Sequence, residues 1–155
     1  MPVIYLETII KAPVGLCFDL SRSIDLHIES TKQTGEIAIA GRTSGLIEQG
    51  ETVTWRAKHL GIWQNLTSKI TAMERPVFFA DEMVAGAFKS FRHEHHFNSA
   101  DGFTIMTDKF NFESPYGWLG SIANKLFLAR YMTNLLVERN KIIKHVAELD
   151  PNKTL

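Results

Sequence analysis

The sequence predicts an α+β domain in which a curved antiparallel sheet of about seven strands surrounds one long C-terminal helix. Two patterns support this prediction. Between Glu51 and Glu113, strand-like segments are separated by turn signals at a spacing typical of consecutive antiparallel strands. After them, residues 116–149 contain no proline and have amphipathic periodicity, which indicates one long helix. Residues 1–155 are expected to form a single domain.

The first elements are a strand and two short helices. Val3 to Ile10 is rich in β-branched and apolar residues, which predicts a strand. Pro13 suits the first turn of a helix, predicted from Pro13 to Leu20. Ser23 is predicted to cap a second helix. The Gly-, Thr- and Ser-rich segment from Thr31 to Gly50 is expected to hold one short strand.

The following strands are divided by Gly61, Arg75-Pro76, Gly86 and Asp101-Gly102. Two loops are predicted in detail, Ala85 to Ala87 and Ser99 to Gly102. The final helix is predicted from Tyr116 to Leu149, and a helix of about 30 residues would be about 45 Å long. Its apolar stripe is expected to pack across the sheet and consists of Leu128, Met132, Leu135, Ile142, Val146 and Leu149.

The composition argues against several classes of protein. The 17 basic residues balance 17 acidic ones without a Lys/Arg-rich run, so no nucleic-acid partner is expected. Cys17 is the only cysteine, which rules out an internal disulfide and fits a reducing cytosol. No basic region precedes the apolar N-terminal residues, and no apolar run approaches the length of a membrane span. The sequence therefore predicts a cytoplasmic protein.

Three of the six histidines lie in the segment RHEHHF. Because alternate residues of a strand share a face, His93 and His95 fall on the same side as Phe91 and Phe97. This side is expected to face the long helix. The opposite side should face solvent, and it carries Arg92, Glu94 and His96.

The predicted loops also set which residues face each other across neighbouring strands. A Ser99 to Gly102 loop places His93 opposite Asp108 and His95 opposite Met106. Directly facing residues have Cβ atoms about 4.5–5.5 Å apart, which allows an imidazole–carboxylate hydrogen bond. The turn at Gly61 is expected to place His59 opposite Gln64.

The element order resembles the helix-grip fold of the START/SRPBCC superfamily, which includes the birch-pollen allergen group and the polyketide cyclases. TIIKAPVGLCFDLS is similar to that superfamily's strand-to-helix opening. GETVTWRAKHLGIWQNLTSKITAMERPVFFADEMVAGAFKSFRHEHHF is similar to a bacterial branch described as ligand-binding or cyclase-like. DKFNFESPYGWLG and RYMTNLLVERNKIIK are similar to the last strand and closing helix of that branch. The resemblance implies a fold built around a cavity.

The inward side of the predicted sheet is more polar than a dry core requires. Buried polar groups lower stability unless they are paired, so these residues either satisfy one another or line a cavity with water and a ligand. Under a fold built around a pocket we favour the cavity. The candidate ligand-contacting residues are Trp55, His59, Gln64, Phe79, Asp81, Phe91, His93, His95, Met106 and Asp108.

The function predicted from the sequence is binding of a small or medium apolar molecule of lipid, isoprenoid or polyketide type. The alternative is a cyclase- or dehydratase-type enzyme in which His93 and Asp108 act as an acid/base pair. The sequence shows no Ser or Cys in a recognisable elbow or triad. A domain that acts only through a protein partner has no positive feature in the sequence.

A metal site is a separate hypothesis. His93 and His95 have a spacing that lets two imidazoles on one strand converge on one ion, with Asp108 or His59 as a third ligand. His-x-His alone is a weak motif, and no cysteine accompanies it. The sequence therefore predicts no metal and no cofactor.

Overall fold

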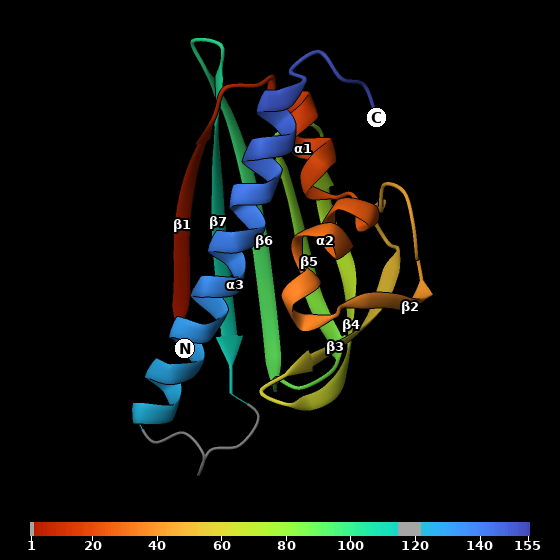
Figure 1. Ribbon diagram of the computed structural model, residues 1–155, viewed down its shortest axis with the longest axis vertical. Helices are drawn as coiled ribbons and strands as arrows, with labels where there is room; N and C mark the ends of the chain where they lie inside the picture. Colours follow the sequence, from red (N-terminus) through yellow and green to blue (C-terminus); the bar gives the residue numbers. More distant parts are fainter. Residues whose placement is uncertain (1, 115–121) are drawn as a thin grey trace.

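The computed structural model describes residues 2–114 and 122–155 (Figure 1). Its strands form one antiparallel sheet of seven, in the order β1-β7-β6-β5-β4-β3-β2. The elements are β1 (Val3–Ile10), α1 (Val14–Ser21), α2 (Ile24–Ser30), the 3₁₀ turn η1 (Lys32–Thr34), β2 (Ile37–Gly41), β3 (Thr52–His59), β4 (Ile62–Glu74), β5 (Phe78–Ala85), β6 (Ser90–Ala100), β7 (Phe103–Glu113) and α3 (Ile122–Leu149).

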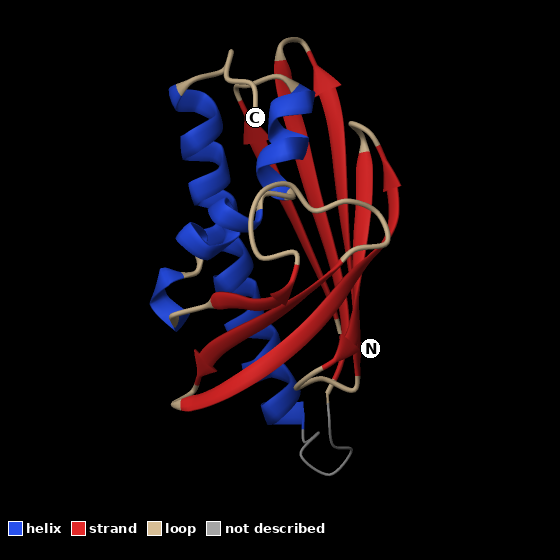
Figure 2. Cartoon of the chain, turned by 90° about the vertical axis from the view of Figure 1, so that its right-hand side faces the viewer, coloured by secondary structure: helices blue, strands red, loops and turns tan. Residues whose placement is uncertain are grey.

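The three helices lie together on one face of the sheet, which curves toward them (Figure 2). The long helix α3 crosses this face, and α1 and α2 lie beside it (Figure 1). The predicted α+β class and helix-grip arrangement are therefore confirmed. In the described residues, no helix is both long enough and apolar enough to cross a membrane.

The N-terminal elements follow the local sequence signals. β1 has the predicted bounds, and α1 begins at Val14 directly after Pro13. The hydroxyl of Ser23 accepts a hydrogen bond from the backbone N–H of Leu26 at 3.2 Å, so Ser23 caps α2 as predicted. Phe18 on α1 is buried against the sheet and makes an edge-to-face contact with Phe97 at 5.5 Å between ring centroids.

The β6–β7 hairpin is tighter than the sequence analysis predicted. Asp101 and Gly102 have φ values of 49° and 82°, so both central residues of the turn are left-handed. Two such residues form a two-residue turn whose twist matches the flanking strands, and Asp-Gly is a preferred pair for it. Ala100 consequently pairs with Phe103, and the predicted four-residue loop is wrong.

The shorter turn shifts the predicted pairing by two residues. Asp108 lies opposite His95, while His93 lies opposite Phe110. Met106 lies opposite Phe97 instead of His95. A shift of two residues leaves every side chain on its predicted face, because side chains alternate with a period of two.

The other hairpins show the same kind of correction. Leu60 and Gly61 have φ values of 52° and 81° and form a second two-residue turn, so His59 pairs with Ile62. Gln64 lies opposite Ala57, which makes the predicted His59–Gln64 pairing wrong. Between β5 and β6 the loop covers residues 86–89, slightly beyond the predicted loop, and Asp81 lies opposite His93.

The helix α3 is described from Ile122, so the predicted start at Tyr116 lies outside the described residues. Its predicted stripe is only partly right, because Leu149 is 70% exposed whereas Ile143 is buried. The buried face also carries Arg139 and Asn140. The stripe predicted from apolar residues is therefore rotated about the helix axis relative to the face of α3 that packs on the sheet.

Candidate functional site

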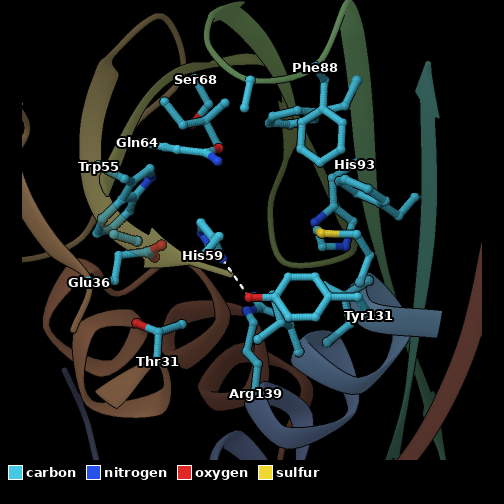
Figure 3. A pocket seen from close by; sticks show the side chains of 18 of the residues that line it. Thr31, Glu36, Trp55, His59, Gln64, Ser68, Phe88, His93, Tyr131 and Arg139 are labelled. Atoms are coloured by element: carbon cyan, nitrogen blue, oxygen red, sulfur yellow. Dashed lines mark hydrogen bonds between the residues drawn. The ribbon is translucent and has the colours of Figure 1, made fainter. Parts of the chain in front are cut away.

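A cavity of about 320 Å³ lies between the sheet and α3 (Figure 3). Aromatic and aliphatic side chains make up most of its wall, and the polar side chains among them come from several elements. A smaller void of about 110 Å³ shares part of this wall, including Trp55, Asp81, His93 and Arg139. The apolar lining includes Trp55, Leu66, Phe88, Phe91, Phe110, Leu128, Met132 and Leu136.

The predicted ligand-contacting residues divide into three groups. Phe79 and His95 line only the smaller void. Met106 and Asp108 are fully buried and are not part of either wall. The other six line the larger cavity and are Trp55, His59, Gln64, Asp81, Phe91 and His93. That any of them contacts a ligand stays a prediction.

Several polar residues of the wall were not predicted from the sequence. Tyr131 and Arg139 reach the cavity from α3, and Glu36 reaches it from the segment that follows η1 (Figure 3). His27 reaches it from α2. Arg139 carried a usable signal, since it lies between apolar residues at helical spacing. His27 and Glu36 carried none, because only the tertiary structure brings their segment to the cavity.

A hydrogen bond joins β3 to α3 at the cavity wall. The Nδ1 atom of His59 lies 2.8 Å from the phenolic oxygen of Tyr131, and the two rings meet edge to face (Figure 3). Burial lowers the pKa of His59 and raises the pKa of Tyr131. Both shifts favour the neutral forms, which suit a partly apolar wall.

A second polar pair lies beside Trp55. The imidazole of His27 stacks on the indole of Trp55 with 4.2 Å between ring centroids. Its Nε2 atom contacts the carboxylate of Glu36. This pair places one acidic group at the edge of an otherwise aromatic part of the wall.

Asp108 is the centre of a buried hydrogen-bond network behind the cavity wall. Its Oδ1 atom lies 2.8 Å from Nε2 of His93, and its Oδ2 atom accepts a hydrogen bond from Asn140 at 2.6 Å. A guanidinium nitrogen of Arg139 lies 3.6 Å from Oδ1. Burial alone would raise the pKa of Asp108, but hydrogen bonding from His93 and the proximity of His95 hold it well below its usual range.

Asp81 lies at the cavity end of the same network. Its Oδ1 atom is 3.1 Å from Nε2 of His95 and 3.9 Å from Nδ1 of His93. Burial would raise the pKa of Asp81, but the hydrogen bond from His95 and the two nearby imidazoles lower it overall. Burial also lowers the pKa of His93, with the neighbouring His95 adding to the effect. Asp108 and Asp81 act in the opposite direction, but the overall shift favours the neutral imidazole.

The outer face of β6 has the predicted orientation. Arg92 donates from Nε to Glu94 at 2.9 Å, and Nε2 of His96 lies 3.2 Å from the other oxygen of Glu94. These side chains form a partly exposed chain of contacts on the solvent side of the strand. His93 and His95, by contrast, are buried on the helix side.

Comparison with known proteins identifies the fold. No family model matches the sequence. No curated protein matches it either. Similar solved structures include the protein TTHA0849 from Thermus thermophilus, with a TM-score of 0.72 and 14% identity over 94% of this chain and 99% of that one.

Two further structures of similar shape have names that refer to a protein group or an activity. The Zhui aromatase/cyclase from Streptomyces sp. R1128 has a TM-score of 0.71 at 13% identity, over 96% of this chain and 94% of that one. Ginseng major latex-like protein 151 from Panax ginseng has a TM-score of 0.66 at 16% identity, over 94% of this chain and 96% of that one. The chain thus has the helix-grip fold that its sequence predicted.

Proposed function

We propose that this protein binds a small or medium apolar molecule of lipid, isoprenoid or polyketide type in the cavity between the sheet and α3. The observation that carries the proposal is the cavity itself, at about 320 Å³. Protein cores are packed to the density of organic crystals, so a void of this size is not a packing defect. Ligand pockets start at about 300 Å³ and combine apolar walls with a few convergent polar groups.

The polar groups of the wall suit a ligand with one polar end. The side chain of Gln64 points into the cavity from β4, on the same part of the wall as His59 (Figure 3). An amide can donate and accept, so Gln64 would hydrogen-bond a carbonyl or a hydroxyl group. The apolar body of the ligand would then contact the rings of Phe88, Phe91 and Phe110.

A substitution that fills the cavity tests the proposal. Ala57 is buried on β3 and lines the cavity, so the larger side chain of Ala57→Leu should occupy part of the space. We expect binding of an apolar fluorescent probe to weaken at least about tenfold, because a factor of ten corresponds to only about 1.4 kcal/mol of binding free energy. Lys58→Leu is the matched control, because it places the same side chain on the exposed face of the same strand. Equal probe binding in both variants, with folded circular-dichroism spectra, would contradict the proposal.

Native mass spectrometry of the protein purified from its own host supplies the identity of the ligand. A retained lipid without a reactive group would support a binding protein. A retained molecule with a reactive carbonyl would support the second candidate, an enzyme of the cyclase or dehydratase kind.

One observation favours that second candidate. His93 lines the cavity, and its Nε2 atom is hydrogen-bonded to the buried carboxylate of Asp108. A carboxylate in this position fixes the imidazole tautomer, with the proton on Nε2, and leaves Nδ1 available to take a proton. Such a pair could promote a cyclisation or dehydration of a bound carbonyl compound by holding it folded and moving a proton.

A further inference from the structure

Three side chains converge where the two voids meet. Asp81 comes from β5, and His93 and His95 come from β6. One ligand atom from each lies within 4.8 Å of the other two. Asp81 and His93 also line the larger cavity, whereas His95 lies behind them.

The distances within this cluster suit a single small ion. Oδ1 of Asp81 lies 3.1 Å from Nε2 of His95 and 3.9 Å from Nδ1 of His93. In a tetrahedral site with bonds of about 2.0–2.1 Å, neighbouring donor atoms are about 3.3 Å apart. These two separations lie on either side of that value, and one ligand atom from each of the three side chains lies within 4.8 Å of the others. Small side-chain rotations would therefore bring all three donors to an ion.

Strand pairing holds the three donors in place. Asp81 lies directly opposite His93 across the β5–β6 ladder, and His95 is the next residue on the same face of β6. The ring of His95 is fixed by stacking on Phe79, with 4.1 Å between centroids. Sites carried by paired strands hold their geometry better than sites carried by loops.

The other imidazole nitrogens face one buried carboxylate. Nε2 of His93 and Nδ1 of His95 lie 2.8 Å and 3.2 Å from the same oxygen of Asp108. Metal-bound histidines usually donate their second N–H to such a carboxylate, which fixes the tautomer and directs the free nitrogen to the ion. The remaining nitrogens are Nδ1 of His93 and Nε2 of His95, and both face Asp81. Asp108 is itself held by Asn140.

In the described part of the chain, one buried ring nitrogen beside this cluster has no hydrogen-bond partner. Among the described residues, Nδ1 of His95 is a buried side-chain nitrogen that makes no hydrogen bond, although Oδ1 of Asp108 lies 3.2 Å away. If Nε2 of His95 donates to Asp81, Nδ1 carries a lone pair that faces a carboxylate. Ligation of an ion at Nε2 would move the proton to Nδ1, where Asp108 can accept it.

We propose that Asp81, His93 and His95 bind one divalent transition-metal ion, with a coordination position open to the cavity. Two imidazoles and one carboxylate suit Zn²⁺, Co²⁺ or Fe²⁺, whereas Mg²⁺ and Ca²⁺ prefer oxygen ligands. The third ligand is Asp81, and neither Asp108 nor His59 takes that place. Asp108 lies on the far side of both rings, and His59 is bonded to Tyr131. This site goes beyond the proposed binding of an apolar molecule.

Metal titration of untagged protein, first treated with a chelator, tests the proposal. We expect one Zn²⁺ per chain by calorimetry, and visible absorption bands with Co²⁺ that Zn²⁺ abolishes. Asp108→Asn should weaken binding by about 10–100-fold, as is typical when a partner of a metal-bound histidine is lost. Asp81→Asn keeps the shape of the side chain, removes a ligand and should weaken binding further.

His96→Gln is the matched control. It removes an imidazole from the same strand but on the outer face, so Co²⁺ binding should not change. Equal binding by wild type and Asp81→Asn would overturn the proposal, and so would loss of binding in His96→Gln.

A wild-type protein without Co²⁺ bands at millimolar metal would also overturn the proposal, even if a variant failed to fold. That result would mean that the three side chains only hold one another in place. Because the titration uses metal alone, its outcome is independent of the apolar-probe experiment.

Discussion

At the scale of single residues, Asp108 joins several buried polar side chains of the interior. It is fully buried, and both of its oxygens have partners among the residues that the structure describes. A buried carboxylate of this kind is stable only because its partners replace the water that it loses. Its contribution should therefore appear in the stability of the fold, because its side chain is not part of the cavity wall.

Asp108→Asn keeps the shape of the side chain and removes the charge. We expect the free energy of unfolding, measured with urea, to fall by about 1–3 kcal/mol because buried donors lose their acceptor. Asp150→Asn, at an exposed aspartate, is the control and should change stability by no more than about 0.5 kcal/mol. For a catalytic His93–Asp108 pair, turnover would instead fall by about 10²–10⁴-fold in protein that remains folded. A variant as stable and as active as wild type would remove Asp108 from both roles.

Cys17 gives a second prediction at this scale. Its thiol is fully buried on α1, and burial raises its pKa, so both access and the thiolate fraction are low. We expect no reaction with an aromatic disulfide reagent in the native state and complete reaction in urea. In Ser99→Cys, one exposed thiol should react at once while Cys17 stays protected. Fast reaction of the wild-type protein would show that α1 opens readily.

At the scale of secondary-structure elements, the contact between β3 and α3 makes one part of the cavity wall sensitive to pH. His59 bonds to Tyr131, and its pKa is lowered by burial, while the nearby Glu36 acts in the opposite direction. Below the unfolded-state pKa of about 6.5, His59 takes up a proton in the unfolded chain but stays neutral in the folded protein until the pH reaches its lower folded pKa. The contribution of His59 to stability is therefore present above that pH and is lost as the pH falls through the lower folded value.

We expect urea-measured stability to fall between pH 7 and pH 5 by a smaller amount in His59→Gln than in the wild type. Comparing the two proteins removes the contribution of other titrating groups common to both. An identical pH dependence in the two proteins would contradict this prediction. It would show that the pKa of His59 is the same in the folded and unfolded proteins or lies outside this range.

At the scale of the whole molecule, the sequence predicted the sheet, the helix-grip arrangement and the faces of its strands. Alternation alone was enough to place His93 and Asp108 on the inner face. It could not give their partners, because pairing depends on the length of each turn, and Asp101-Gly102 forms a two-residue turn rather than a four-residue loop. Arg139 was not predicted, because the packing face of the helix was predicted from apolar residues only. Its guanidinium is buried close to the carboxylate of Asp108.

The two-residue hairpin at Asp101-Gly102 also bears on how such a scaffold can change over evolutionary time. A slip of one residue in β7 would turn Asp108 toward solvent and an outward residue toward the interior. A slip of two would keep every side chain on its face of the sheet and bring Asp108 opposite His93 instead of His95. On such a sheet, a buried side chain can therefore change its partner in steps of two residues while every side chain stays on its own face.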